Sequence, residues 1–281
     1  MTKKAVLTTG LLTVLISISA FLFYNVKADG KLDKKNYVQS TTPTLFFHGY
    51  GSSANAERHM TNAAKKAGVT KTVIRANVDR NGAVTLRGDI PKGAINPIVE
   101  VNYEDNRNPI DVGRYAKAVV SKLQEKYGFT KMNMVGHSLG NMSILYYLLE
   151  HAQDENLPQL QKQVNIANFA AGLEAVGLPS DVKVDKTTGQ PNQVTQTFQR
   201  LLPLREVFPQ NQIDVLNIYG DYKNGSDGSV LNASSRSLKY LVVDNAKSYQ
   251  EKKITGKLAQ HSQLHENPEV DKILIQFLWG K

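Results

Sequence analysis

The stretch KMNMVGHSLG, residues 131–140, decides the fold of this chain. Its first six residues predict a strand, and the apolar run that continues to His151 predicts a helix. Between the two, glycines flank Ser138 in the spacing G-x-S-x-G. A serine in such a turn projects its hydroxyl from a strained backbone, and the glycines avoid side-chain carbons that would clash with the strand and the helix. Ser138 is therefore a candidate nucleophile, and an ordinary serine in a glycine-rich turn is the alternative.

Strands and helices are predicted alternately on both sides of this turn. The predicted strands cover residues 44–47, 72–78, 83–88, 98–103, 131–136, 164–170, 213–219 and 248–255. The predicted helices cover residues 54–67, 111–127, 139–151, 230–243 and 268–279. Asn81-Gly82 predicts a hairpin between the second and third strands. The alternation favours an α/β fold with a largely parallel sheet, in which functional residues follow the carboxyl ends of the strands.

The composition narrows the class of protein. The length of 281 residues suits one large domain or two small ones, and the 41% of hydrophobic residues is enough for a core. The absence of cysteine excludes disulfides, thiolate zinc sites and cysteine nucleophiles. The net charge of +9 comes from scattered basic residues without a nucleic-acid-binding pattern. We therefore expect no nucleic-acid partner, and at most a mild attraction to an anionic envelope or membrane.

The N-terminus has the pattern of an export signal. Lys3 and Lys4 precede an apolar run over residues 5–23, and Val26-Lys27-Ala28 offers a cleavage site before Asp29. The run is nearly long enough to span a bilayer, so an uncleaved anchor is the alternative. Either form places the rest of the chain outside the cytoplasm, secreted or held at the cell surface. We predict a signal or anchor over 1–28, a polar tether over 29–42 and a folded domain over 43–281.

Candidate partners for Ser138 follow the last two strands. Asp221 and Asp227 come after the seventh strand, and His261 and His265 lie between the eighth strand and the last helix. A serine beside a neutral imidazole that a carboxylate orients is the arrangement of nucleophilic acyl transfer. The residues themselves leave the choice within each pair open.

With these motifs in place, the chain resembles the α/β-hydrolase superfamily. More narrowly, it resembles the exported Gram-positive cell-surface α/β-hydrolases, a family without an assigned substrate. The resemblance covers about residues 43–281, and the chain order serine, acid, histidine agrees with it. It rests on the stretches Phe47-His48-Gly49-Tyr50-Gly51-Ser52-Ser53, Gly136–Gly140, Ser226–Val230 and His261–Asn267.

The resemblance also favours particular partners. Asp227 begins a D-x-x-V pattern that leads into a helix, as the superfamily's acid often does, which leaves Asp221 as the alternative acid. His261 is followed by a tail like that of many hydrolases, which leaves His265 as a supporting or helix-entry residue. The implied fold is the α/β-hydrolase fold.

The resemblance further implies an oxyanion hole and a reaction. The backbone N–H of Leu139 is one expected donor, and that of Tyr50, in the turn after the first strand, is the other. The expected reaction is two-step hydrolysis of a small-molecule or lipid carboxylic ester, without a metal or organic cofactor. An acyltransferase with the same residues and a catalytically idle surface-binding protein are the alternatives.

The long connection over residues 172–212 is expected to form a small cap. Its apolar part, residues 198–208, offers two readings. The side chains could line a pocket for an acyl group, or they could pack the insertion onto the core. The sequence does not choose between them.

Overall fold

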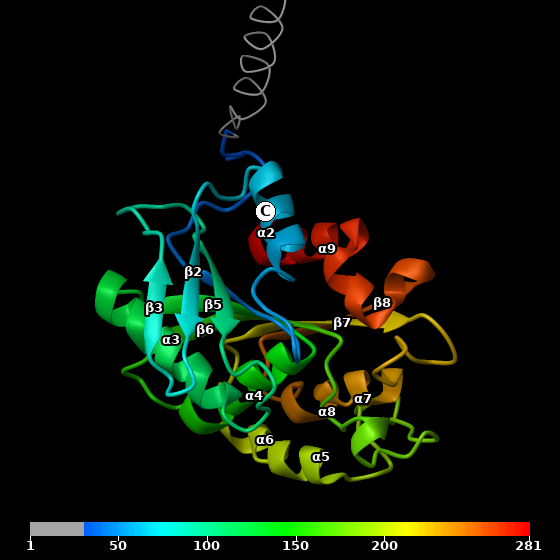
Figure 1. The fold of residues 1–281 in the computed structure, drawn as a ribbon. Coiled ribbons are helices and arrows are strands. Elements are labelled where there is room, and N and C mark those ends of the chain that lie inside the picture. Colours follow the sequence, from blue (N-terminus) through cyan, green and yellow to red (C-terminus); the bar gives the residue numbers. More distant parts are fainter. Residues whose placement is uncertain (1–30) are drawn as a thin grey trace, which may run out of the picture. The chain divides into compact units, whose positions relative to one another are not determined.

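The structure is a computed structural model that describes residues 31–281 (Figure 1). The signal or anchor predicted over 1–28, with its cleavage point before Asp29, lies outside the described residues. Among residues 31–281, no helix has the length and apolar character needed to cross a membrane.

Eight strands form one sheet in the order β3-β2-β4-β1-β5-β6-β7-β8. All neighbouring strands are parallel except β2 and β3, which form the antiparallel hairpin predicted at Asn81-Gly82. The predicted α/β fold with a mostly parallel sheet is thereby confirmed. The strands are β1 (Thr44–Phe47), β2 (Val73–Val78), β3 (Val84–Arg87), β4 (Ile98–Tyr103), β5 (Lys131–His137), β6 (Gln159–Ile166), β7 (Asp214–Asp221) and β8 (Ser248–Thr255).

The helices flank both faces of this sheet, as Figure 1 shows. The α-helices are α2 (Arg58–Lys66), α3 (Val112–Tyr127), α4 (Leu139–His151), α5 (Gln196–Leu201), α6 (Leu204–Val207), α7 (Asn232–Arg236), α8 (Leu238–Val242) and α9 (Pro268–Trp279). Residues 31–281 also contain three short 3₁₀ helices, which are η1 (Glu174–Val176), η2 (Lys257–Ala259) and η3 (His261–Glu266). Helices α2 and α9 contact each other on one face, while α3 and α4 pack together on the other.

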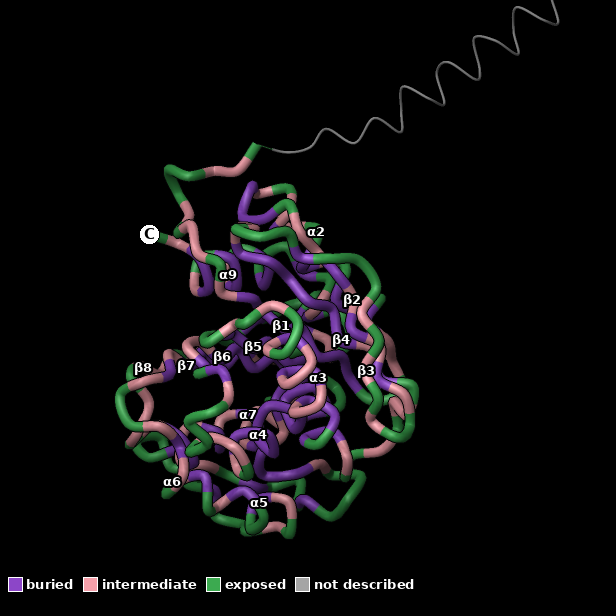
Figure 2. The backbone as a smooth tube through the Cα atoms, turned by 90° about the vertical axis from the view of Figure 1, so that its left-hand side faces the viewer, coloured by how far each residue is buried: buried purple, intermediate pink, exposed green. Residues whose placement is uncertain are grey.

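Because side chains alternate between the two faces of the sheet, the core forms two clusters, one on each face. Leu45 and Phe47 of β1 belong to the cluster that includes α3 and α4, and Phe46 belongs to the cluster with α2 and α9. Successive side chains of a strand point to opposite faces, so a strand covered on both faces is apolar throughout. Figure 2 shows the central strands and α4 as the buried part of the molecule.

One strand begins earlier than its sequence suggested. The prediction placed it at 164–170, whereas β6 starts at Gln159 and ends at Ile166. Its first half is mainly polar and only partly buried, so it forms no apolar run that would predict a strand. Beyond the strand, Ala167 has a positive φ of 50°, which turns the chain out of the sheet.

The described part of the predicted tether lies along the domain. The backbone N–H of Asp33 donates to Gly68 O, and that of Val38 donates to Trp279 O at 2.8 Å. Asn96, which is buried, donates its side-chain amide to Val38 O at 2.7 Å. Residues 33–38 therefore run beside the end of α9 and the start of β4.

The apolar part of the 172–212 connection belongs to the core. Phe198, Leu201, Leu204 and Phe208 are almost completely buried, in the same cluster as α4 and α8. Helix α5 contacts α4, and α6 contacts both α4 and α8. Of the two readings of this stretch, the structure shows the packing one.

Candidate active site

Ser138 stands on a sharp turn between β5 and α4. Its backbone has φ 52° and ψ −118°, a conformation that L-residues rarely adopt. A Cβ atom at Gly136 would lie 2.7 Å from the backbone of Gly140, and one at Gly140 would collide with the carbonyl of Phe47. The two glycines are therefore required by close backbone approach, and the turn exposes the serine at the carboxyl end of the sheet.

Two side chains far apart in sequence meet at this serine. His261 Nε2 lies 2.9 Å from Ser138 Oγ, and its Nδ1 lies 2.8 Å from Asp227 Oδ2. In the neutral ring, Nδ1–H donates to the carboxylate and Nε2 accepts the serine hydroxyl proton. This line of hydrogen bonds can move a proton from the hydroxyl to the imidazole.

Asp227 is buried and held by several donors. Its Oδ1 accepts from the backbone N–H groups of Ser229, at 2.8 Å, and Val230, at 2.7 Å. Its own backbone carbonyl accepts from the N–H of His261 at 2.9 Å. These bonds fix the carboxylate and the start of η3 with respect to each other, so the imidazole is presented in one orientation.

The two alternates take other partners. Asp221, the last residue of β7, lies 3.2 Å from Lys253 Nζ on β8. His265 Nδ1 lies 3.3 Å from Glu266 Oε1, and its ring packs edge-on against His137 at 4.7 Å between centroids. The structure thus brings together Ser138, Asp227 and His261, and it pairs Asp221 and His265 elsewhere.

Two further histidines support the backbone of the site. His137 Nε2–H donates to the carbonyl of His261 at 3.0 Å, and burial holds the pKa of His137 well below its usual value, with the nearby His261 and His265 adding to the effect. His48 Nδ1–H donates to Gly49 O, and its Nε2 accepts from the N–H of Tyr103. Burial lowers the pKa of His48 as well, so both rings remain neutral hydrogen-bonding spacers.

The expected oxyanion donors border the serine. A Cβ at Gly49 would lie 3.2 Å from Ser138 Cβ, so the turn that carries Tyr50 passes beside the nucleophile. The N–H of Tyr50 has no acceptor among the described residues, and Leu139 is the first residue of α4, where an N–H has no intrahelical partner. Both donors are available to a ligand.

Two asparagines hold the turns at Ser138 and Gly51, and the sequence patterns did not indicate either of them. Asn141 Nδ2 donates to the carbonyls of Ser138, at 2.9 Å, and Ile166, at 2.8 Å. Asn106 accepts from the N–H of Gly51 through its backbone carbonyl, and it donates its side-chain amide to Ser52 O. Neither residue belongs to a motif, and their roles follow from contacts between distant segments. Within residues 31–281, no three His, Asp or Glu side chains are grouped as metal ligands.

Comparisons with known proteins agree with this architecture. The family described as alpha/beta hydrolase of unknown function (DUF915) matches residues 31–281. The lin2722 gene product of Listeria innocua has a similar structure, with a TM-score of 0.78 and 28% identity over 85% of this chain and 94% of that chain. A protein of Lactobacillus plantarum WCFS1, named as a cell surface hydrolase, has a TM-score of 0.67 and 20% identity over 84% of this chain and 89% of that one. No curated protein matches the sequence.

Proposed function

Because the chain belongs to this family of α/β hydrolases of unknown function, we propose that it is a serine hydrolase that cleaves carboxylic esters. One observation carries the proposal: hydrogen bonds of 2.8 and 2.9 Å join Asp227, His261 and Ser138 in a single line. That geometry is what a serine hydroxyl needs to attack a carbonyl carbon.

The first half of the reaction forms an ester on the enzyme. Ser138 Oγ attacks the substrate carbonyl while His261 Nε2 takes the hydroxyl proton. Asp227 keeps the proton on Nδ1 and stabilises the positive imidazolium. The same proton then passes from Nε2 to the leaving alcohol as the carbon–oxygen bond breaks, which leaves the acyl group on Ser138.

The second half releases the acid. His261 Nε2 removes a proton from water, the hydroxide attacks the acyl carbon, and the proton returns to Ser138 Oγ. In both halves the negative oxygen of the tetrahedral intermediate accepts from the N–H groups of Tyr50 and Leu139. Loss of one such donor typically costs about 3 kcal/mol of transition-state stabilisation.

The proposal favours esters because an alcohol leaves a tetrahedral intermediate more readily than an amine. The ester belongs to a small molecule or a lipid. Water is the acyl acceptor, and analysis of products formed with added alcohols tests for transfer to another acceptor.

We further propose that the domain works outside the cytoplasm. The basic start and the apolar run over residues 5–23 support this, as does the similarity in fold to a protein named as a cell surface hydrolase. Mass spectrometry of the protein from an expressing bacterium tests cleavage. A mature chain that begins at Asp29 indicates a signal peptide, and an intact N-terminus indicates an anchor.

Fluorophosphonate labelling tests the nucleophile. We expect Ser138→Ala to abolish both labelling and turnover of p-nitrophenyl esters, because no other group replaces the attacking oxygen. Ser262→Ala is the matched control, since that exposed serine adjoins His261 and its hydroxyl donates no hydrogen bond to the described part of the chain. Undiminished labelling of the Ser138→Ala protein would refute the proposed mechanism.

The two histidines provide a second test. We expect His261→Ala to lose at least about 10³-fold in kcat/KM, since general-base catalysis disappears. His265→Ala should retain most of the activity, because its ring contacts His137 and Glu266 rather than the serine. The opposite ranking would exchange their roles.

A further inference from the structure

Exposed large apolar side chains gather at one edge of the sheet. Seven of them occur in the described part of the chain, and six follow the carboxyl ends of parallel strands. We call these six the apolar rim: Tyr50 after β1, Ile110 after β4, Val176 and Val194 after β6, Tyr222 after β7 and Leu258 after β8. Val38 is the seventh, and its backbone contacts with Trp279 and Asn96 place it at the opposite edge.

Contacts between loops place the rim around the proposed nucleophile. Tyr50 adjoins Gly49, which lies against Ser138. The loop of Ile110 is fastened to the same turn, because Asn106 bonds to the backbone of Gly51 and Ser52. The two loops therefore form one side of the opening to the serine.

The opposite side is built around Asp227 and His261. The Tyr222 ring lies 3.9 Å from where a Cβ of Gly228 would stand, next to Asp227. Leu258 is three residues before His261 in sequence, in the turn η2 that directly follows β8.

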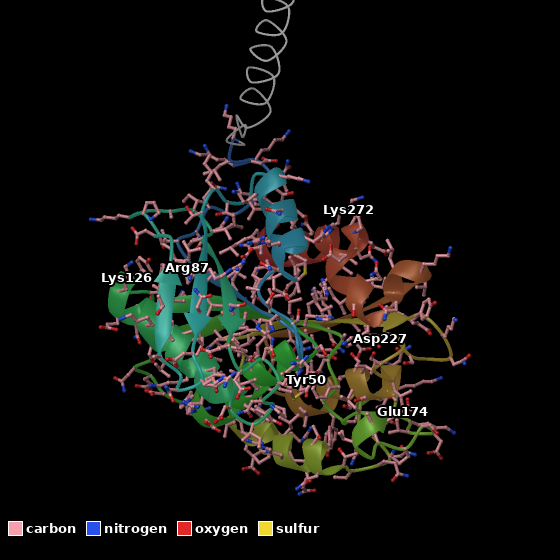
Figure 3. All side chains as sticks on the ribbon, in the orientation of Figure 1. Tyr50, Arg87, Lys126, Glu174, Asp227 and Lys272 are labelled. Carbon is pink, nitrogen blue, oxygen red and sulfur yellow. The ribbon has the colours of Figure 1, made fainter. Side chains whose placement is uncertain are left out.

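The β6–α5 connection closes the third side. Thr195 Oγ1 donates to Ala171 O at 2.7 Å, which returns Val194 to the end of β6, where η1 also begins. In Figure 3, Tyr50, Asp227 and Glu174 of η1 lie in the same part of the view, away from Arg87 and Lys126. Exposed apolar side chains are ordinary when scattered, but a set confined to the border of an active site points to a contact surface.

Unpaired cations accompany the rim. The Arg107 guanidinium lies 3.5 Å from the Cβ position of Gly51, Lys223 Nζ lies 5.0 Å from the centre of the Tyr222 ring, and Lys257 adjoins Leu258 in η2. Among the described residues, none of the three forms an ion pair.

Carboxylates also occur in the loops at this edge, and some of them are paired with cations. Asp111 lies 3.3 Å from Arg114, and Asp221 lies 3.2 Å from Lys253, so those two are neutralised. Among residues 31–281, Asp105 in the loop after β4 and Glu174, Asp181 and Asp185 in the β6–α5 connection form no ion pair. Lys223 and Lys257 therefore stand beside Tyr222 and Leu258 in loops whose own carboxylates are paired, whereas Asp105 is two residues from Arg107.

We propose that the apolar rim binds the surface of an anionic phospholipid membrane, so that Ser138 receives ester substrates from the lipid phase. The delivery of substrate rests on the proposed hydrolase function, whereas the binding does not. A fluid bilayer accepts separated apolar side chains without a complementary groove. Tyrosine rings suit the headgroup region, and lysine and arginine beside them meet lipid phosphates.

A single-cysteine experiment tests which edge meets the membrane. The full chain contains no cysteine, so Leu258→Cys and Tyr222→Cys each accept one environment-sensitive dye, such as a nitrobenzoxadiazole. Val38→Cys is the matched control, because Val38 is 42% exposed and Leu258 is 43% exposed. All three variants also carry Ser138→Ala, so turnover cannot alter the vesicles.

We expect vesicles of phosphatidylglycerol and phosphatidylcholine to raise and blue-shift the emission of the dyes at 258 and 222, and brominated lipids to quench it. The dye at 38 should respond much less. Equal responses at all three positions, or a response at 38 alone, would overturn the proposal.

Binding strength supplies the second measurement. We expect the Tyr222→Ser/Leu258→Ser double variant to bind the same vesicles about tenfold more weakly than the Val38→Ser protein. Lys223→Gln and Lys257→Gln should each weaken binding about fivefold at low salt. Equal binding to pure phosphatidylcholine vesicles would contradict the anionic assignment. Failure of fluorophosphonate to label Ser138 would instead refute the hydrolase function and leave the dye results standing.

Discussion

Two fully buried carboxyl groups differ in their hydrogen-bond partners. Asp227 in the candidate active site accepts two backbone hydrogen bonds and one from His261. Glu57, the residue just before α2, is 0% exposed, and within residues 31–281 neither of its carboxyl oxygens has a hydrogen-bond partner. Both side chains are buried to the same degree, so what distinguishes Asp227 from Glu57 is the set of hydrogen-bond partners around each carboxyl group.

Around Glu57 the neighbouring acids already have their own counter-groups. Glu100 bonds to Arg75 at 2.9 Å and to the hydroxyl of Thr61 at 2.8 Å, and His59 lies 3.3 Å from Glu266. Burial raises the pKa of Glu57 well above its ordinary value, and the negative Glu100 and Glu266 raise it further. The raised pKa favours the neutral carboxylic acid at Glu57, whereas Asp227 has the donors that suit a carboxylate.

The largest expected effect lies on the Asp227 side of this comparison. Asp227→Asn should lower kcat by about 10⁴-fold, because an amide in that position no longer selects the tautomer with Nδ1 protonated. The measurement is ester turnover by the purified variant. Asp221→Asn is its control and should stay within about twofold of the unaltered protein, since its exposed pair with Lys253 contributes little. A larger loss for Asp221→Asn would reverse the assignment of the acid.

Glu57→Gln tests the other side, through stability. The unfolded chain releases the Glu57 proton near the ordinary value of 4.5, whereas the folded chain keeps it until a higher pH. Between those two values the unaltered protein loses up to about 1.4 kcal/mol of unfolding free energy per pH unit from this group. The Gln variant lacks that loss, so its stability relative to the unaltered protein should increase from pH 5 to pH 8.

Urea unfolding at the two pH values measures the difference. Glu155→Gln, at an exposed position, is the matched control and should show no such change. A Glu57→Gln protein whose relative stability does not depend on pH would mean that Glu57 ionises in the folded state.

The smallest expected effect concerns His59, which lies between the carboxylates of Glu266 and Asp271. His59 Nε2 lies 2.8 Å from Asp271 Oδ2, and it joins α2 to α9. Burial raises the pKa of Asp271, and His59 opposes that rise. Removing a partly exposed partner should cost about 1 kcal/mol of unfolding free energy in His59→Ala. The control is His151→Ala, where the nearest carboxylate is 3.9 Å away, and an equal loss in both would show that the His59 contacts contribute nothing.

Local patterns predicted most of the fold. The strand at 44–47 has the bounds expected, and the helix at 139–151 begins and ends as predicted, because both are buried along most of their length and therefore stand out as mainly apolar runs. The polar start of β6 was not predicted, because its side chains are only partly buried and form no apolar pattern. The predicted helix over 230–243 is two short helices, α7 and α8, joined at Ser237.

By itself, the sequence determined the alternation of strands and helices and the glycine-flanked turn at Ser138, because both depend on neighbours within a few residues. The contacts of the candidate site needed the tertiary structure. Ser138 and His261 are 123 positions apart, and which carboxylate reaches the imidazole depends on how the loops after β7 and β8 pack. Glu57 shows the same limit, since no neighbouring residue in the sequence reveals that folding buries its carboxyl group and leaves it without a hydrogen-bond partner among residues 31–281.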